Sequence, residues 1–147
     1  MLALAIAAFL IAPAPTLWLP PLGQELRISE HYDLANGPYA AGHRGIDLPA
    51  TGPRRVVAPT HGTVTFSGTV VDRPLLSIRV GDDTVLTLEP IESDLKPGDV
   101  VARGQPVGTL SSGGHCANEC LHLGVRIHGE YTNPLRYFRG RPVLLPW

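Results

Sequence analysis

The chain has 147 residues, of which 44% are hydrophobic and 17% are charged, with 12 Lys and Arg against 13 Asp and Glu. This length suffices for one domain with a hydrophobic core, and the composition excludes an intrinsically disordered chain. The nearly balanced charge differs from that of nucleic-acid-binding domains, which carry a strong basic excess, so we expect no nucleic-acid partner.

The N-terminus begins with an unbroken apolar run, LALAIAAFLIA, at residues 2–12. The run is too short to cross a bilayer, which takes about 20 residues. It has the length of a secretory signal's apolar centre, and Ala12-Pro13-Ala14 resembles a signal cleavage site, although no basic residue precedes it. A buried strand or helix is the alternative. We interpret 1–14 as a signal or apolar leader and predict a secreted or envelope-associated protein, with membrane contact only through this segment if it is retained.

The next segment, PTLWLPPLGQE at residues 15–25, is rich in proline and has no hydrophobic period. Such a composition is typical of an extended lead-in or linker. We therefore expect the folded domain to occupy residues 26–147.

Short apolar or alternating segments then follow one another and predict β-strands. They lie at 54–59, 62–71, 75–80, 84–89, twice within 96–110, and at 120–128. Only residues 133–138 look helical, with Asn133 as N-cap and Pro134 at the first helical position. The 16 glycines and 15 prolines favour tight turns over long helices. We predict an all-β fold, an antiparallel sandwich or open barrel.

The segment GHRGIDLPA at 42–50 places a histidine and an aspartate, His43 and Asp47, four residues apart. In a fully extended strand both side chains would share one face but lie about 13 Å apart. They could bind one metal ion only if the chain bends, which Gly42 and Gly45 would permit. The alternative is a surface histidine followed by an aspartate in a turn.

The segment HCANECLHLGV at 115–125 contains both cysteines of the chain, Cys116 and Cys120. In an exported protein so close a pair indicates a disulfide, whereas in a cytosolic protein it would indicate a metal or redox role. On a strand, Cys120 and His122 share one face, opposite the apolar face of Leu121, Leu123 and Val125. His122 is then either a site residue or a solvent-facing histidine.

Four segments in one order carry a family resemblance: GHRGIDL, VVAPTHGTVTFSG, DLKPGDVVARGQPVG and CLHLGV. Over about residues 40–138 the chain resembles the lysostaphin-type, or LytM-like, zinc metallopeptidases that cut peptidoglycan cross-bridges. The resemblance implies that family's antiparallel β-sandwich with a duplicated hybrid motif, zinc as cofactor and peptidoglycan peptide as substrate. It points to an actinobacterial exported branch, and we expect a monomer.

The resemblance also implies site residues. The His-x-x-x-Asp motif matches His43 and Asp47, and the second histidine of the family's His-x-His motif matches His122. Two histidines and one carboxylate with an open fourth position are what a catalytic zinc ion requires. The resemblance thus implies a zinc-activated water that attacks an amide carbonyl.

Both catalytic histidines of the family are replaced here, one by Cys120 and the other by Glu89. A glutamate can act as a general base beside zinc, but a disulfide-bonded cysteine has no proton to give. His115 is the other histidine of the Cys116–Cys120 region, and it reaches the site only if a disulfide folds the loop over. Otherwise it is a plain loop residue. We interpret the remaining histidines as surface residues: His31, His61 and His128.

Several alternatives stay open at this point. The protein is a zinc-dependent hydrolase, or a catalytically impaired member that binds the cell wall or regulates a hydrolase. Cys116 and Cys120 form a disulfide at the rim of the metal site, or they ligate a structural zinc. GTVTFSG and GDVVARGQPVG also resemble biotinyl and lipoyl carrier domains, but the single lysine, Lys96, lies outside the hairpin that such a carrier modifies.

Overall fold

The computed structural model describes residues 16–34 and 42–139, so the expected leader at 1–14 lies outside the described residues. These residues form β1 (Gly45–Pro49), β2 (Arg55–Val57), β3 (Gly62–Val70), β4 (Arg73–Val80), β5 (Thr84–Glu89), β6 (Ile91–Glu92), β7 (Val100–Val101), β8 (Pro106–Leu110), β9 (Cys120–Ile127), β10 (Glu130–Thr132) and the helix α1 (Leu135–Phe138). None of the described helices is long and apolar enough to span a membrane.

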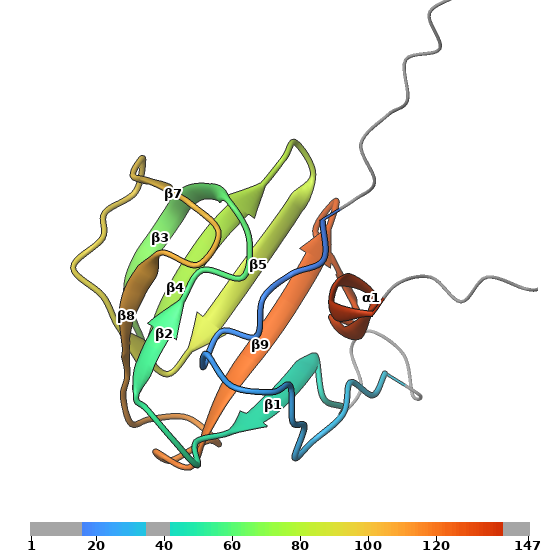
Figure 1. The fold of residues 1–147 in the computed structure, drawn as a ribbon, viewed down its shortest axis with the longest axis vertical. Coiled ribbons are helices and arrows are strands. Elements are labelled where there is room, and N and C mark those ends of the chain that lie inside the picture. Colours follow the sequence, from blue (N-terminus) through green and yellow to red (C-terminus); the bar gives the residue numbers. More distant parts are fainter. Residues whose placement is uncertain (1–15, 35–41, 140–147) are drawn as a thin grey trace, which may run out of the picture.

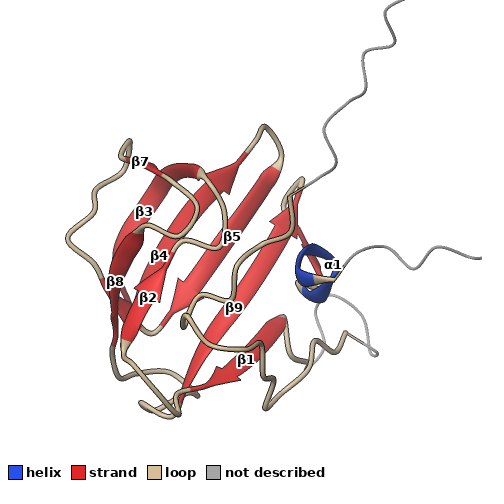
Figure 2. Cartoon of the chain, in the orientation of Figure 1, coloured by secondary structure: helices blue, strands red, loops and turns tan. Residues whose placement is uncertain are grey.

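The strands build two antiparallel sheets that face each other (Figures 1 and 2). The larger sheet has seven strands in the order β1-β9-β5-β4-β3-β7, with β10 paired to β9, and the smaller has the order β2-β8-β6. The prediction of an all-β antiparallel sandwich is confirmed. Three strands were not predicted, namely β1, β6 and β10, because each is short or contains a proline, a glycine or charged residues.

Strand β9 shows how the sequence divides the large sheet into two faces. Leu121, Leu123 and Val125 have 0% exposure and point into the core between the sheets, as predicted. Side chains alternate across a strand, so His122 and Arg126 lie on the opposite face. The core is completed by apolar residues of the neighbouring strands, among them Ile46, Leu48, Leu76, Ile78, Leu86 and Leu88.

The proline-rich segment contributes to this core, which its composition did not indicate. Trp18 and Leu22 are buried, and the Trp18 ring stacks on Tyr137 of α1 with ring centroids 4.1 Å apart. Backbone hydrogen bonds tie the segment to the domain, from Leu19 N–H to the Pro59 carbonyl and from Trp18 N–H to the Tyr137 carbonyl, both 2.9 Å. The reason is the large apolar area of tryptophan, which is favourable to bury even in an irregular segment.

The helix begins one residue later than predicted, at Leu135. The Asn133 side-chain oxygen accepts a hydrogen bond from the Leu135 N–H at 3.0 Å, which is the contact expected of a capping residue.

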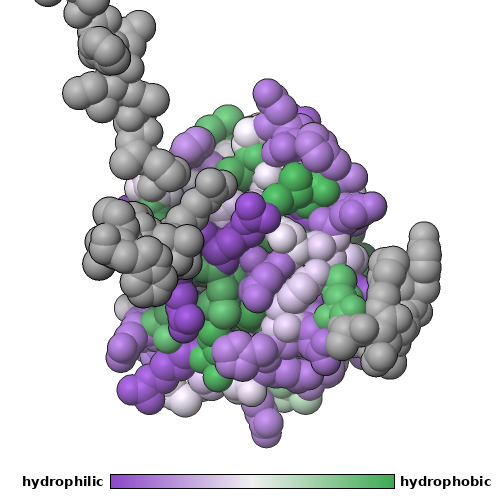
Figure 3. Space-filling model, turned by 90° about the vertical axis from the view of Figure 1, so that its right-hand side faces the viewer, coloured by the Kyte–Doolittle hydropathy of each residue, from purple (hydrophilic) through white to green (hydrophobic). Residues whose placement is uncertain are grey.

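On the side of the molecule shown in Figure 3, small apolar patches are scattered among hydrophilic side chains.

Candidate metal centre

Two paired strands position the centre of the site. In the ladder between β1 and β9, Asp47 lies directly opposite His122, and in the ladder between β9 and β5, His122 lies opposite Glu89. Directly opposite residues in an antiparallel pair project from the same face of the sheet. The three side chains therefore stand in one row on the face that points away from the core.

His43 approaches this row from outside the sheet. It precedes β1 and forms an isolated bridge with Asp33, in which the two backbone N–H groups donate to the opposite carbonyls at 2.9 and 2.8 Å. The His31 carbonyl lies 2.9 Å from His43 Nδ1 and can only accept, so Nδ1 carries the proton and Nε2 faces Asp47. The separation expected for an extended strand does not arise, because β1 begins only at Gly45.

Three ligand atoms meet in a compact triangle. His43 Nε2 lies 3.0 Å from Asp47 Oδ1 and 3.1 Å from His122 Nδ1, and His122 Nδ1 lies 2.7 Å from Asp47 Oδ1. Zinc binds such nitrogen and oxygen atoms at about 2.0–2.2 Å, so atoms this close to one another can share one ion. The donor set of two imidazoles and one carboxylate fits zinc.

The carboxylate at the centre is buried, with Asp47 only 2% exposed and His122 8% exposed. Burial has the largest single influence on the Asp47 carboxyl and by itself raises its pKa. The hydrogen bond with His122 and the electrostatic influence of His122, His43 and His115 together outweigh burial, so the pKa of Asp47 lies below its usual value. Asp47 is therefore held in the charged form that a cation prefers.

Gly45 is required here by close packing. A Cβ atom at this position would lie 2.4 Å from the Leu123 carbonyl oxygen and 2.6 Å from His122 Nε2. At Gly42 a Cβ atom would lie 2.4 Å from the Asp33 carbonyl oxygen. We expected these glycines to allow a bend, but their role in the structure is to let the His122 ring and the bridge with Asp33 approach the backbone.

A fourth imidazole, that of His115, enters the site from the loop before β9. Its Nε2 lies 2.9 Å from Asp47 Oδ2, and its ring makes edge-to-face contacts with His43 and His122 at centroid distances of 5.6 and 5.1 Å. Unlike the other two histidines, its side chain is 49% exposed. The sequence suggested His115 only on the condition that a disulfide folds the loop over the site, and the structure has this arrangement.

That disulfide joins Cys116 to Cys120, with the Cα atoms 4.9 Å apart. A disulfide sulfur is not a thiolate and does not ligate a metal as one, so this bond removes the cysteines from the set Asp47, His115, Cys116 and Cys120. Further contacts hold the loop, since the Ala50 N–H donates to the Glu119 carbonyl at 2.9 Å and Arg54 donates to the Asn118 side-chain oxygen. The disulfide thus carries His115 to the rim of the site.

Glu89, the residue expected to serve as general base, lies on the correct face but is engaged elsewhere. Its Oε2 accepts a hydrogen bond from Arg73 Nε at 3.0 Å, and its side chain is 14% exposed. The histidines without motif support lie outside the cluster: His61 is exposed, His128 pairs with Asp83, and His31 contributes only its backbone carbonyl.

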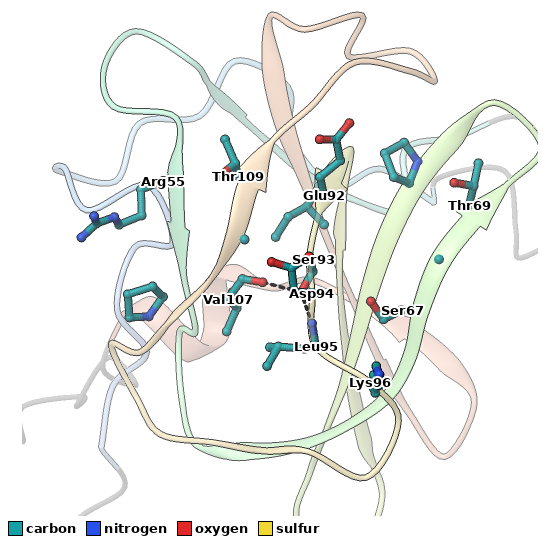
Figure 4. A pocket seen from close by; sticks show the side chains of 15 residues that line it. Arg55, Ser67, Thr69, Glu92, Ser93, Asp94, Leu95, Lys96, Val107 and Thr109 are labelled. Atoms are coloured by element: carbon teal, nitrogen blue, oxygen red, sulfur yellow. Dashed lines mark hydrogen bonds between the residues drawn. The ribbon is translucent and has the colours of Figure 1, made fainter.

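A separate pocket of about 1020 Å³ lies between β3 and the β6–β8 pair (Figure 4). Its charged lining residues are Arg55, Glu92, Asp94 and Lys96, and no histidine lines it. The imidazole cluster is therefore distinct from this pocket. Lys96 lies in the loop after β6 and not at the tip of a hairpin between paired strands.

Known sequences are similar to this chain. The sequence profile of Peptidase family M23 matches residues 41–134. The uncharacterized protein Rv2891 of Mycobacterium tuberculosis is 28% identical over 131 residues, covering 85% of this chain and 53% of that protein. The murein hydrolase activator NlpD of Escherichia coli is 28% identical over 116 residues, covering 71% of this chain and 28% of NlpD. The chain thus spans about half or less of the length of these relatives.

Solved structures share the fold. Csd3 of Helicobacter pylori matches with a TM-score of 0.72 and 23% identity over 90% of this chain and 37% of its own. A mutant catalytic domain of the prophage-encoded M23 protein EnpA from Enterococcus faecalis matches with a TM-score of 0.67 and 25% identity, over 82% of this chain and 97% of its own. A chain of the SpoIIQ–SpoIIIAH pore forming complex matches with a TM-score of 0.70 and 17% identity, over 84% of this chain and 90% of its own. The fold therefore occurs in a catalytic domain and in a pore-forming complex.

Proposed function

Because this chain belongs to peptidase family M23, as the four motifs suggested, we propose that it is a zinc-dependent hydrolase of peptidoglycan peptides. The observation that carries the proposal is the triangle of His43 Nε2, Asp47 Oδ1 and His122 Nδ1, with edges of 2.7 to 3.1 Å. The similarity to a murein hydrolase activator supports the cell wall as the place of action. We place the protein at the cell envelope or outside the cell, as a monomer.

The chain's residues supply the ligands that the chemistry needs. His43, Asp47 and His122 would hold the zinc ion, and three protein ligands leave one position for solvent or substrate. A bound zinc ion supplies a Lewis acid and lowers the pKa of a water molecule toward neutrality. The Asp47 carboxylate would balance part of the positive charge of the zinc ion. The hydrogen bond from His43 Nδ1–H to the His31 carbonyl keeps the His43 ring oriented.

Two residues are candidates to move protons, His115 and Glu89. His115 Nε2 lies 2.9 Å from Asp47 Oδ2, beside the triangle, and its ring is half exposed to solvent. Glu89 neighbours His122 in the sheet but is held by Arg73 at 3.0 Å. We favour His115 as the general acid and base, with Glu89 as the next candidate.

One observation favours a second candidate function. The ligand atoms of His43, Asp47, His115 and His122 all lie within 4.8 Å of one another. If His115 were a fourth ligand, the site would be closed, as structural zinc sites are. The protein would then be a cell-wall-binding or hydrolase-regulating module without activity of its own.

The deciding experiment combines zinc quantification, peptidoglycan digestion and the absorption spectrum of the cobalt-substituted protein. If His115 moves protons, His115→Ala keeps one metal per chain and an unchanged cobalt spectrum but lowers the rate about 10²- to 10⁴-fold. Glu89→Gln then has a smaller effect, and the exposed-histidine control His61→Ala has none. If wild type releases no fragments and His115→Ala alters the cobalt spectrum, the closed-site function is correct and the hydrolase proposal is wrong.

A further inference from the structure

The face of the large sheet that carries the site is organised in three rows across the strands. The metal row consists of Asp47, His122 and Glu89. The small-residue row, two positions along each strand, consists of Gly45, Gly124, Thr87 and Ser77. The arginine row, two positions further, consists of Tyr131, Arg126, Val85 and Arg79.

The small-residue row lies between the other two and is largely covered, because Gly45, Gly124 and Ser77 are buried and the His122 ring lies against both glycines. Two of its members are glycines, and the hydroxyls of Thr87 and Ser77 are hydrogen-bonded to each other at 3.1 Å. Successive rows are two residues apart, about 7 Å along each strand. The arginine row therefore lies about 14 Å from the metal row. An extended peptide that runs along the strand direction above this face would reach the arginine row about four residues from a carbonyl held at the metal row.

The arginine row carries positive charge that the protein does not neutralise. Within the part of the chain that the structure describes, neither Arg126 nor Arg79 takes part in an ion pair. Arg126 is half-buried, and its guanidinium lies 5.8 Å from the ring centroid of Tyr131, directly opposite it in the ladder. Arg44, beside the ligand His43, approaches the same ring at 5.6 Å. Tyr131 thus contacts the guanidinium groups of both arginines and helps to orient Arg126.

We infer that Arg126, oriented by Tyr131, binds a carboxylate of the substrate peptide about four residues from the scissile bond, and that the protein selects peptides with a free carboxylate there over amidated ones. The inference rests on the proposed function and adds the substrate class. A guanidinium pairs with a carboxylate through two parallel hydrogen bonds, and the corresponding amide lacks the charge. The carboxylate can come from an acidic side chain or from a free C-terminus.

The test uses the full chain and two pairs of synthetic peptides. One pair differs only in a side-chain carboxylate against its amide, and the other only in a C-terminal acid against its amide. Binding is measured by calorimetry on the zinc-free protein, where no cleavage interferes, and hydrolysis is measured with zinc. We expect the acid of at least one pair to bind about tenfold more tightly than its amide, as for a hydrogen bond to a charged group, and to lose this preference at high salt.

The variants identify the residue responsible. Arg126→Gln should reduce the acid-to-amide preference to about one, and Arg126→Lys should retain part of it. Arg55→Gln, at an exposed arginine of the other sheet, should leave the preference unchanged. Equal binding of acid and amide, no binding of any peptide, or full preference in Arg126→Gln overturns the inference. If the wild-type protein binds acids in preference to amides but cleaves no peptide in the presence of zinc, the inference stands and the proposed hydrolase is wrong.

Discussion

Two regions of the molecule, the ladder of β1 and β9 and the loop before β9, carry residues of the site and hold them differently. The ladder of β1 and β9 carries Asp47 and His122, both buried and in register on hydrogen-bonded strands. The loop at 111–119 carries His115, half exposed, in a segment with left-handed backbone at Gly113, Gly114, Ala117 and Asn118. The ladder positions its ligands through the sheet itself, whereas the loop depends on one disulfide and a few hydrogen bonds.

This difference in burial suggests that the ladder and the loop have different roles in the site. Residues in buried ladders open only with much of the domain, while exposed loops open locally at low cost. The ladder is suited to hold a metal permanently, and the loop is suited to carry a group that moves protons or yields to substrate. The following experiments test this division, in order of decreasing effect.

Removing a ladder ligand should have the largest effect. We expect His122→Ala to weaken zinc binding by more than about 100-fold, since even the loss of an outer-sphere partner costs 10- to 100-fold. Chelator competition measures the affinity, and His128→Ala serves as the control, because His128 is 78% exposed and paired with Asp83. An unchanged zinc stoichiometry in either His122→Ala or His43→Ala would refute the ligand assignment.

A methyl group placed inside the ladder should come next. Gly45→Ala forces a Cβ atom against the Leu123 carbonyl and the His122 ring, so we expect a loss of about 1–3 kcal/mol in unfolding free energy together with weaker zinc binding. Urea unfolding measures the first effect. The matched control is Gly68→Ala, where the nearest atom is a Phe66 ring carbon at 3.4 Å. Equal stability of the two variants would show that the ladder tolerates the change.

Removing the disulfide of the loop should lower the unfolding free energy by less than Gly45→Ala does. Replacing Cys116 and Cys120 by alanine should lower the unfolding free energy by about 2 kcal/mol or less, because the closed loop is short. Zinc affinity should stay near that of wild type, while hydrolysis falls to the level of His115→Ala. Thiol titration of the denatured wild-type protein provides the control, and two reactive thiols there would contradict the disulfide.

The smallest effect on stability is expected from the loop histidine alone. His115→Ala should change the unfolding free energy by less than about 0.5 kcal/mol, because the side chain is half exposed and fills no core position. Thermal unfolding of the zinc-free protein measures it. A loss comparable to that of Gly45→Ala would mean that the loop is as integral to the fold as the ladder, and the proposed division would be wrong.

The sequence predicted most of the sheet and missed parts of the site, for physical reasons. Strands with alternating Val, Leu and Thr were recognisable because burial on one face imposes a period of two. Strand β1 was missed because GIDLP is only five residues long and contains glycine, aspartate and proline, which are uncommon in strands. The contact between Arg73 and Glu89 was invisible as well, since it joins side chains 16 residues apart whose pairing depends on the register of β4 and β5.

By itself, the sequence determined the β-sandwich class, the inward face of β9 and the family motifs, because these follow from local periodicity and from spacing within short segments. Only the tertiary structure decided which histidines meet. His43 and His122 are 79 residues apart, and His115 and Asp47 are 68 apart, so their contacts depend on strand register and loop path. Local spacing contains no information on such distances, because the free energy that sets them comes from burying the core on the other side of the sheet.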